Sequence, residues 1–162
     1  IGGWDTSKMT DMDYAFHQAA AFNQDIGGWD TSKVTRMMAL VSVTTGFNQD
    51  IGAWDVSKVT SMAETFDQAV SFDQDIGAWD VSKVTDMDFA FGGATAFNQD
   101  IGAWDVSSVT NMERTFEGAA VFNQNISAWN TSKVTRMDDM FLLSGLQSCP
   151  PWAVDKFAGG PC

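Results

Sequence analysis

Several kinds of residue are scarce in this chain of 162 residues, and each shortage narrows what the protein can be. Cysteine occurs twice and histidine once, which leaves few ligands for a structural metal site and few members for a catalytic set. Nine basic residues stand against 21 acidic ones, and the net charge of −12 disfavours nucleic acid, whose phosphates would be repelled. No run of 18 apolar residues occurs, so we expect no membrane insertion in this segment.

Both cysteines and all three prolines lie in the last 14 residues, a segment that does not follow the repeat motif of the rest of the chain. We predict a disulfide between Cys149 and Cys162, because the count is even and a metal site would need more ligands. Closing a loop of this size contributes roughly 3 kcal/mol. Residues 142–162 are therefore predicted to form a disulfide-closed C-terminal cap, which implies an oxidising, extracellular setting.

The rest of the chain consists of one sequence motif that repeats with a period of 25 residues. The stretch FNQDIGAWD at 97–105 recurs with few changes at 22–30, 47–55, 72–80 and 122–130. The tryptophans keep this period without a slip: Trp4, Trp29, Trp54, Trp79, Trp104 and Trp129. One copy cannot bury its own aromatic residues, whereas stacked copies can. We therefore predict a six-coil solenoid over residues 1–141, which starts inside a repeat and continues upstream in the native chain.

Within each copy the apolar spacing changes from strand-like to helix-like. The alternation of Trp104 and Val106 predicts a short strand with Asp105 outside. Met112, Phe116 and Ala119 then follow at helical spacing, and Thr110 three residues before Glu113 predicts a helix cap. The expected fold class is an α/β solenoid of right-handed, leucine-rich-repeat-like coils, with one short strand and one short helix per repeat.

The spacing Ile-x-x-Trp-x-Val-x-x-Val also matches the leucine-rich-repeat pattern, with Val in place of the usual last Asn or Cys. Across residues 1–141, the motif FNQDIGxWDxSxVTxMxxxF resembles the repeats of BspA-like leucine-rich-repeat surface proteins of bacteria and microbial eukaryotes, a type also abundant in mycoplasma lipoproteins. The resemblance implies an extracellular or cell-surface location and a role in adhesion or protein binding, and it does not imply an enzyme.

Two polar rows on the expected strand face are the candidate partner-binding site. Stacking would align equivalent residues of neighbouring coils into ladders. The rows are formed by Asp5, Ser7, Asp30, Ser32, Asp55, Ser57, Asp80, Ser82, Asp105 and Ser107. In one interpretation each Asp only accepts hydrogen bonds from its own turn, with neighbouring lysines offsetting the charge. In the other, the rows bind a protein or surface ligand.

Other rows suggest ligands with less support. Asp25, Asp50, Asp75 and Asp100 are weak calcium candidates, because carboxylates recur there but the calcium-binding repeat signature is absent. The threonine row that contains Thr110 could form an ice-binding array, although capping already accounts for it. No cofactor is otherwise expected. Catalysis needs one unique constellation, whereas these polar residues are repeated, so we expect no enzyme.

We therefore predict an extracellular, non-enzymatic module that binds protein or mediates adhesion. The alternative is a structural subunit, since an uncapped edge at Ile1 could self-associate head to tail into a filament or surface layer. A calcium-dependent or ice-binding repeat protein is the third hypothesis.

Overall fold

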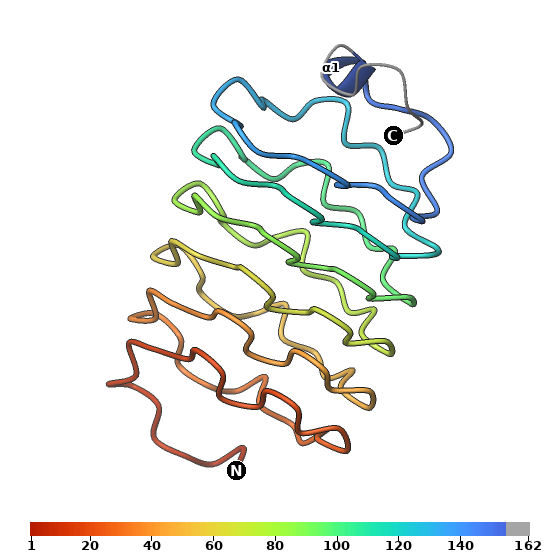
Figure 1. Ribbon diagram of the computed structural model, residues 1–162. Coiled ribbons are helices and arrows are strands. Elements are labelled where there is room, and N and C mark those ends of the chain that lie inside the picture. The colour runs from red at the N-terminus through yellow and green to blue at the C-terminus, as the bar shows by residue number, and fades with distance from the viewer. Residues whose placement is uncertain (155–162) are drawn as a thin grey trace.

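The repeats form coils that stack along one axis, with the N-terminus at one end and the short helix α1, Pro151–Val154, at the other (Figure 1). The computed structural model describes residues 1–154. Neighbouring coils are joined in parallel by single-residue bridges. These bridges connect, in order, Asp11, Arg36, Ser61, Asp86, Asn111 and Arg136.

The predicted α/β architecture is wrong. Within residues 1–154, α1 is the only helix and no β-strand is present. The coils are built from consecutive turns, so the predicted leucine-rich-repeat pattern of one strand and one helix per coil does not occur. The predicted cap and the Cys149–Cys162 pair lie partly outside the described residues; Cys149 itself is disulfide-bonded.

The expected strand is replaced by two turns that its own polar residues form. Asp105 Oδ1 accepts a hydrogen bond from the backbone N–H of Ser107 at 3.0 Å, and the N–H of Val109 bonds the carbonyl of Val106 at 2.9 Å. Asp and Ser side chains offer the backbone a local partner that competes with strand pairing. The predicted inward direction of Trp104 and Val106 is confirmed, since both are buried.

The expected helix is replaced by turns whose backbone hydrogen bonds alternate in direction. The N–H groups of Phe89 and Phe91 bond carbonyls of the next coil, those of Glu113 and Thr115, at 3.0 and 2.9 Å. The N–H between them, that of Ala90, bonds back within its own coil to Met87 at 3.0 Å. An α-helix would use every interior N–H four residues back along its own chain and leave none for a neighbour.

Positive φ angles accompany this alternation. Two residues per coil take them: in the fourth coil they are Phe89 at 50° and Gly93 at 61°. Left-handed backbone at a residue other than glycine costs about 1 kcal/mol or more and persists only where its surroundings enforce it. Here the hydrogen bonds from these same N–H groups to the next coil hold it, so the conformation depends on stacking.

Aromatic columns form the core along the whole stack. The rings of Trp29 and Trp54 are 6.5 Å apart and nearly parallel at 5°, and those of Phe72 and Phe97 are 6.1 Å apart. The five tryptophans from Trp29 to Trp129 are 3–7% exposed. Each also donates its indole N–H to an isoleucine carbonyl of the preceding coil, as Trp79 does to Ile51 at 3.2 Å. The indole polar group is therefore satisfied inside a dry interior.

The FNQD corner is explained by a ladder of side-chain amides. Asn98 Oδ1 accepts from the backbone N–H of Asn123 and from Gln124 Nε2, both at 2.9 Å. Asp73 fills the same role one coil earlier, where it accepts from Asn98 and Gln99. Only an acceptor is needed at this position, which is why Asp can replace Asn there.

The tail continues the tryptophan column although its sequence has left the repeat. Trp152 stacks on Trp129 with ring centres 6.5 Å apart, and its indole N–H bonds Ile126 O at 3.0 Å. It lies 23 residues after Trp129 rather than 25. Trp152 therefore covers the end of the aromatic column.

Candidate functional site

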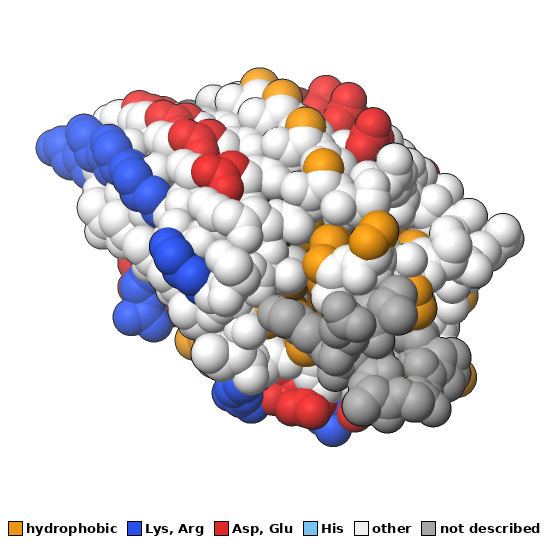
Figure 2. Space-filling model, turned by 90° about the horizontal axis from the view of Figure 1, so that it is seen from above, with side chains coloured by type: hydrophobic (Ala, Val, Ile, Leu, Met, Phe, Trp, Pro, Cys, Tyr) orange, Lys and Arg blue, Asp and Glu red, His pale blue; other side chains and the backbone are white. Residues whose placement is uncertain are grey.

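The predicted Asp and Ser rows lie together on one exposed surface, which we call the ladder face: residues 5–10, 30–35, 55–60, 80–85, 105–110 and 130–135. Figure 2 shows acidic and basic side chains in rows along the stack. In this face two lysines reach back to the preceding coil: Lys33 Nζ donates to Ser7 O and Lys58 Nζ to Ser32 O, both at 2.7 Å. The structure thus brings the predicted rows together as ladders.

The carboxylates of these rows are occupied by their own turns. Each of the five accepts a hydrogen bond from the backbone N–H two residues later, as Asp55 does from Ser57 at 3.0 Å. Hydrogen bonds from the following serine lower the pKa of the carboxyl at every one of these positions: Asp5, Asp30, Asp55, Asp80 and Asp105. This matches the local-turn interpretation; contact with a partner stays a prediction.

The four weak calcium candidates are likewise turn formers. Asp25, Asp50, Asp75 and Asp100 each accept the N–H of the glycine two residues on, at 2.9–3.0 Å. In the described part of the chain, no group of three or more His, Cys, Asp or Glu side chains is placed to hold a metal ion. Calcium binding through this row therefore has no support from the geometry.

The threonine row does not cap helices, contrary to expectation, because the coils contain none. From Thr35 onward, each hydroxyl instead donates to the carbonyl of the equivalent threonine one coil earlier, as Thr110 does to Thr85 at 3.1 Å. The row is exposed. Ice binding stays a prediction, as does self-association at the first coil, where Trp4 is 63% exposed.

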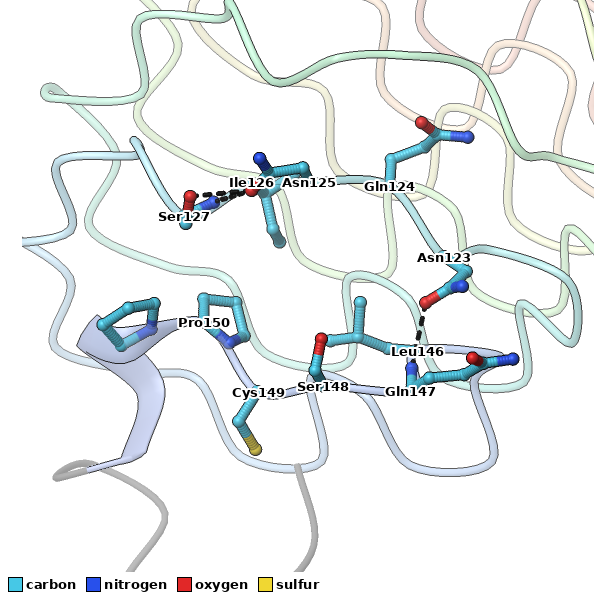
Figure 3. Close-up of a pocket in the computed structure, with 11 residues that line it drawn as sticks. Asn123, Gln124, Asn125, Ile126, Ser127, Leu146, Gln147, Ser148, Cys149 and Pro150 are labelled. Atoms are coloured by element: carbon cyan, nitrogen blue, oxygen red, sulfur yellow. Dashed lines mark hydrogen bonds between the residues drawn. The ribbon is translucent and has the colours of Figure 1, made fainter.

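A hollow of about 340 Å³ marks the place where the repeat gives way to the tail (Figure 3). Its polar groups are largely engaged in holding the chain: Asn125 Oδ1 accepts from Ser127, and Asn123 Oδ1 accepts from the N–H of Gln147 at 3.0 Å. Gln124 Nε2 donates to Asn98. Of these contacts, the one between Asn123 and Gln147 joins the last repeat to the tail.

A second surface, which we call the turn face, carries the residues that differ between coils. It comprises residues 11–18, 36–43, 61–68, 86–93, 111–118 and 136–143, which hold the positive φ angles. The serine row of the ladder face is identical in all six coils, but two rows here hold six different residues each. The first is Tyr14, Ala39, Glu64, Phe89, Arg114 and Asp139, and the second is His17, Ser42, Asp67, Gly92, Glu117 and Leu142. Of these residues, Ala39, Ser42 and Gly92 are buried, and the others reach the surface.

Sequence reasoning missed this surface because it followed what repeats. The informative positions were the variable ones. Among near-identical repeats of 25 residues, the positions that vary are those whose side chains are not required for stacking. Catalytic and binding residues are found preferentially on such variable segments held by a rigid scaffold.

The turn face also carries the ion pairs and the most perturbed carboxyl group. Arg36 pairs with Asp13, and Arg136 with Glu113. Burial raises the pKa of Asp67 to about 6, and the charges of Glu64 and Glu117 act in the same direction. Its hydrogen bonds from Gln68 and Ser42, which oppose the shift, are long at 3.3 and 3.5 Å.

The raised pKa of Asp67 predicts a pH dependence of stability. A folded-state pKa above the unfolded value favours the protonated fold, so this contribution is present below pH 3.8 and lost as the pH rises to about 6. We expect Asp67→Asn to flatten the fall in the free energy of unfolding over this window, as measured by urea unfolding at several pH values. Asp80→Asn is the control, because the lowered pKa of Asp80 places its effect below this window. An unchanged slope in Asp67→Asn would contradict the assignment.

Within residues 1–154, no helical segment has the length and hydropathy of a membrane span. A family model described as "Mycoplasma protein of unknown function, DUF285" matches residues 1–91 and again residues 65–150. Comparisons with curated proteins and with solved structures give no match.

Proposed function

The chain belongs to the DUF285 family, whose description assigns no activity, and from its surface we propose that it is a non-enzymatic, protein-binding module that recognises its partner through the turn face. The variation of this face between coils carries the proposal. A stack built from near-identical copies needs no such variation for folding, and a heterogeneous surface is what discriminates one partner from another.

The chemistry of the two faces favours the turn face over the ladder face. The ladder face repeats one set of groups, and its carboxylates already accept hydrogen bonds from their own chain. The turn face combines both signs of charge with exposed apolar side chains, among them Tyr14 at 51% and Leu143 at 78% exposure. Aromatic and apolar anchors beside charged groups are typical of protein-binding surfaces.

An extracellular or cell-surface location completes the proposal. It is supported by the resemblance of the repeats to BspA-like surface proteins and by the disulfide-bonded state of Cys149, which suits an oxidising compartment. Adhesion is the corresponding role.

Selection of random 12-residue peptides displayed on phage, with the intact chain immobilised, tests this proposal. The test variant exchanges two turn-face residues, Glu64→Arg with Arg114→Glu, which keeps net charge and composition unchanged. The row already accepts six different side chains at positive φ, so the exchange should be tolerated. We expect selected peptides to bind this variant at least tenfold more weakly.

The matched control changes the ladder face. Asp55→Asn with Asp80→Asn reproduces what the sixth coil already has, since Asn130 Oδ1 accepts from the N–H of Ser132 at 3.1 Å. Binding should be unchanged in this control. Peptides that lose affinity for the control but not for the exchange variant would place recognition on the ladder face, and a selection that enriches nothing on the intact chain would also count against the proposal.

A further inference from the structure

A hollow of about 250 Å³ lies on the turn face across the third to sixth coils. The side chains and glycines that shape it are Asp67, Phe89, Gly93, Glu117, Gly118 and Leu143. Small-molecule pockets usually start at about 300 Å³ and enclose their ligand. This hollow is smaller and open, which suits one side chain of a partner rather than a separate small ligand.

Missing side chains create the hollow. Other coils place glutamine, valine or leucine at the last positive-φ position, as Gln68 and Val43 show, whereas the fourth and fifth coils have Gly93 and Gly118. Backbone strain therefore does not demand glycine there. A Cβ added at Gly118 would meet only ordinary contacts, with Gly93 Cα at 3.6 Å. The two glycines leave open a space that the repeat elsewhere fills.

Of the two carboxylates at the hollow, Asp67 has no ion pair in the described residues, and Glu117 shares its cation with a third carboxylate. Asp67 has only the long hydrogen bonds from Gln68 and Ser42. Glu117 lies 3.5 Å from Arg114 Nε, a pair shared with Asp139 at the same distance. Burial raises the pKa of Asp67, and the charges of Glu64 and Glu117 act in the same direction, so a cation placed beside Asp67 would offset the repulsion between these carboxylates.

The remaining wall is apolar and already holds one cation. Arg114 lies over the ring of Phe89, with 5.3 Å from Cζ to the ring centre. Leu143 is 78% exposed beside the same space. Long basic side chains bury their methylene stems on such surfaces while the charged head stays near water and carboxylates.

We propose that this hollow receives a lysine or arginine side chain of a partner polypeptide, with its stem against Phe89 and Leu143 and its cationic head at Asp67 and Glu117. The inference rests on the proposed function and names the partner chemistry at its recognition face. The net charge of −12 for the chain would steer such a basic segment toward it.

A titration of the isotope-labelled chain with short peptides, followed by NMR, tests the proposal. The probe is acetyl-Ala-Leu-Lys-Leu-Ala-amide, and the matched probe has norleucine in place of lysine, which keeps the stem and removes the charge. We expect shifts centred on the amides of Gly93 and Gly118, and at least tenfold weaker binding of the norleucine peptide.

Three variants locate the contact. Gly118→Gln fills the hollow with the residue that the third coil carries there, and Asp67→Asn with Glu117→Gln removes its charge; each should weaken binding tenfold or more. Asp55→Asn with Asp80→Asn makes the same change in net charge on the ladder face and should leave binding unchanged. The peptide comparison uses the unaltered chain, so it decides even if a variant does not fold.

Equal binding of the lysine and norleucine peptides would overturn the inference, and so would equal weakening of binding by the ladder-face control. A third contradicting result would be no chemical-shift change at Gly93 and Gly118 at about 10 mM peptide, a concentration well above a dissociation constant of about 1 mM. The proposed function fails separately. If the selected peptides bind the turn face but contain no basic residue, the proposed function is supported and only the inference about a basic side chain is contradicted.

Discussion

Trp79→Ala should lower the free energy of unfolding by about 4 kcal/mol, within the range seen when a buried aromatic residue is truncated in a core. Trp79 is 3% exposed and stacks at 6.4 Å on Trp54. Its loss opens a cavity in the middle of the aromatic column and leaves Ile51 O without its indole donor. Urea unfolding followed by far-ultraviolet circular dichroism measures the loss.

The position of Trp79 in the stack adds a second expectation. In a repeat array each coil contacts only its neighbours, so weakening one interior interface reduces the coupling between the two sides. The unfolding transition should therefore broaden as well as shift. Trp4→Ala is the control: Trp4 is 63% exposed, and its removal should cost about 1 kcal/mol or less. Equal losses at both positions would show that the column does not carry the stability.

The second large effect is expected at Gly102, where the backbone of the next coil approaches closely. A Cβ there would lie 2.5 Å from Asn125 O, a backbone atom that cannot move aside. Overpacking of this kind typically costs 1–3 kcal/mol, so we expect Gly102→Ala to destabilise by about 3 kcal/mol. For a domain of this size, that lowers the melting temperature by roughly 6–12 °C.

The chain supplies its own control for this prediction. Gly28 has no atom within 4 Å of an added Cβ, and alanine occupies the equivalent position in the next four coils. Gly28→Ala should therefore be neutral or slightly stabilising. Ser127 stands where earlier coils have Gly102 and its equivalents, beside the hollow where the chain leaves the repeat. A similar melting temperature for Gly102→Ala and Gly28→Ala would refute the close-approach explanation.

These predictions separate two kinds of residue that look alike in the repeat. Trp79 and Gly102 hold one coil to the next, so their substitution acts on stability. The Asp67 side chain reaches a neighbouring coil only through the long hydrogen bond from Ser42, and Gly118 has no side chain. Apart from the pH-dependent effect of Asp67 on stability, their substitution should therefore act on binding. The amide and indole ladders also explain why so many polar residues recur in every repeat. Their side chains accept or donate hydrogen bonds between neighbouring coils.

The sequence alone was enough to derive the period of 25 and the inward rows of Trp, Ile, Met and Phe. It offered the local role of the Asp-x-Ser turns as one of two interpretations. These features depend only on residue types and their spacing, which are the same whatever backbone conformation the coil adopts. The secondary structure could not be derived in this way. Met112 and Phe116, four residues apart, lie on one buried side whether the backbone is a helix or a run of turns, so apolar spacing does not distinguish the two.

Only the tertiary structure decided between them, because the deciding interactions join different coils. Positive φ at residues such as Phe89 is unfavourable in isolation and is held by hydrogen bonds to the next coil, which no local pattern contains. The same holds for the candidate site. The hollow combines Asp67, Phe89, Glu117 and Leu143 from four successive coils, and only stacking brings them to one place.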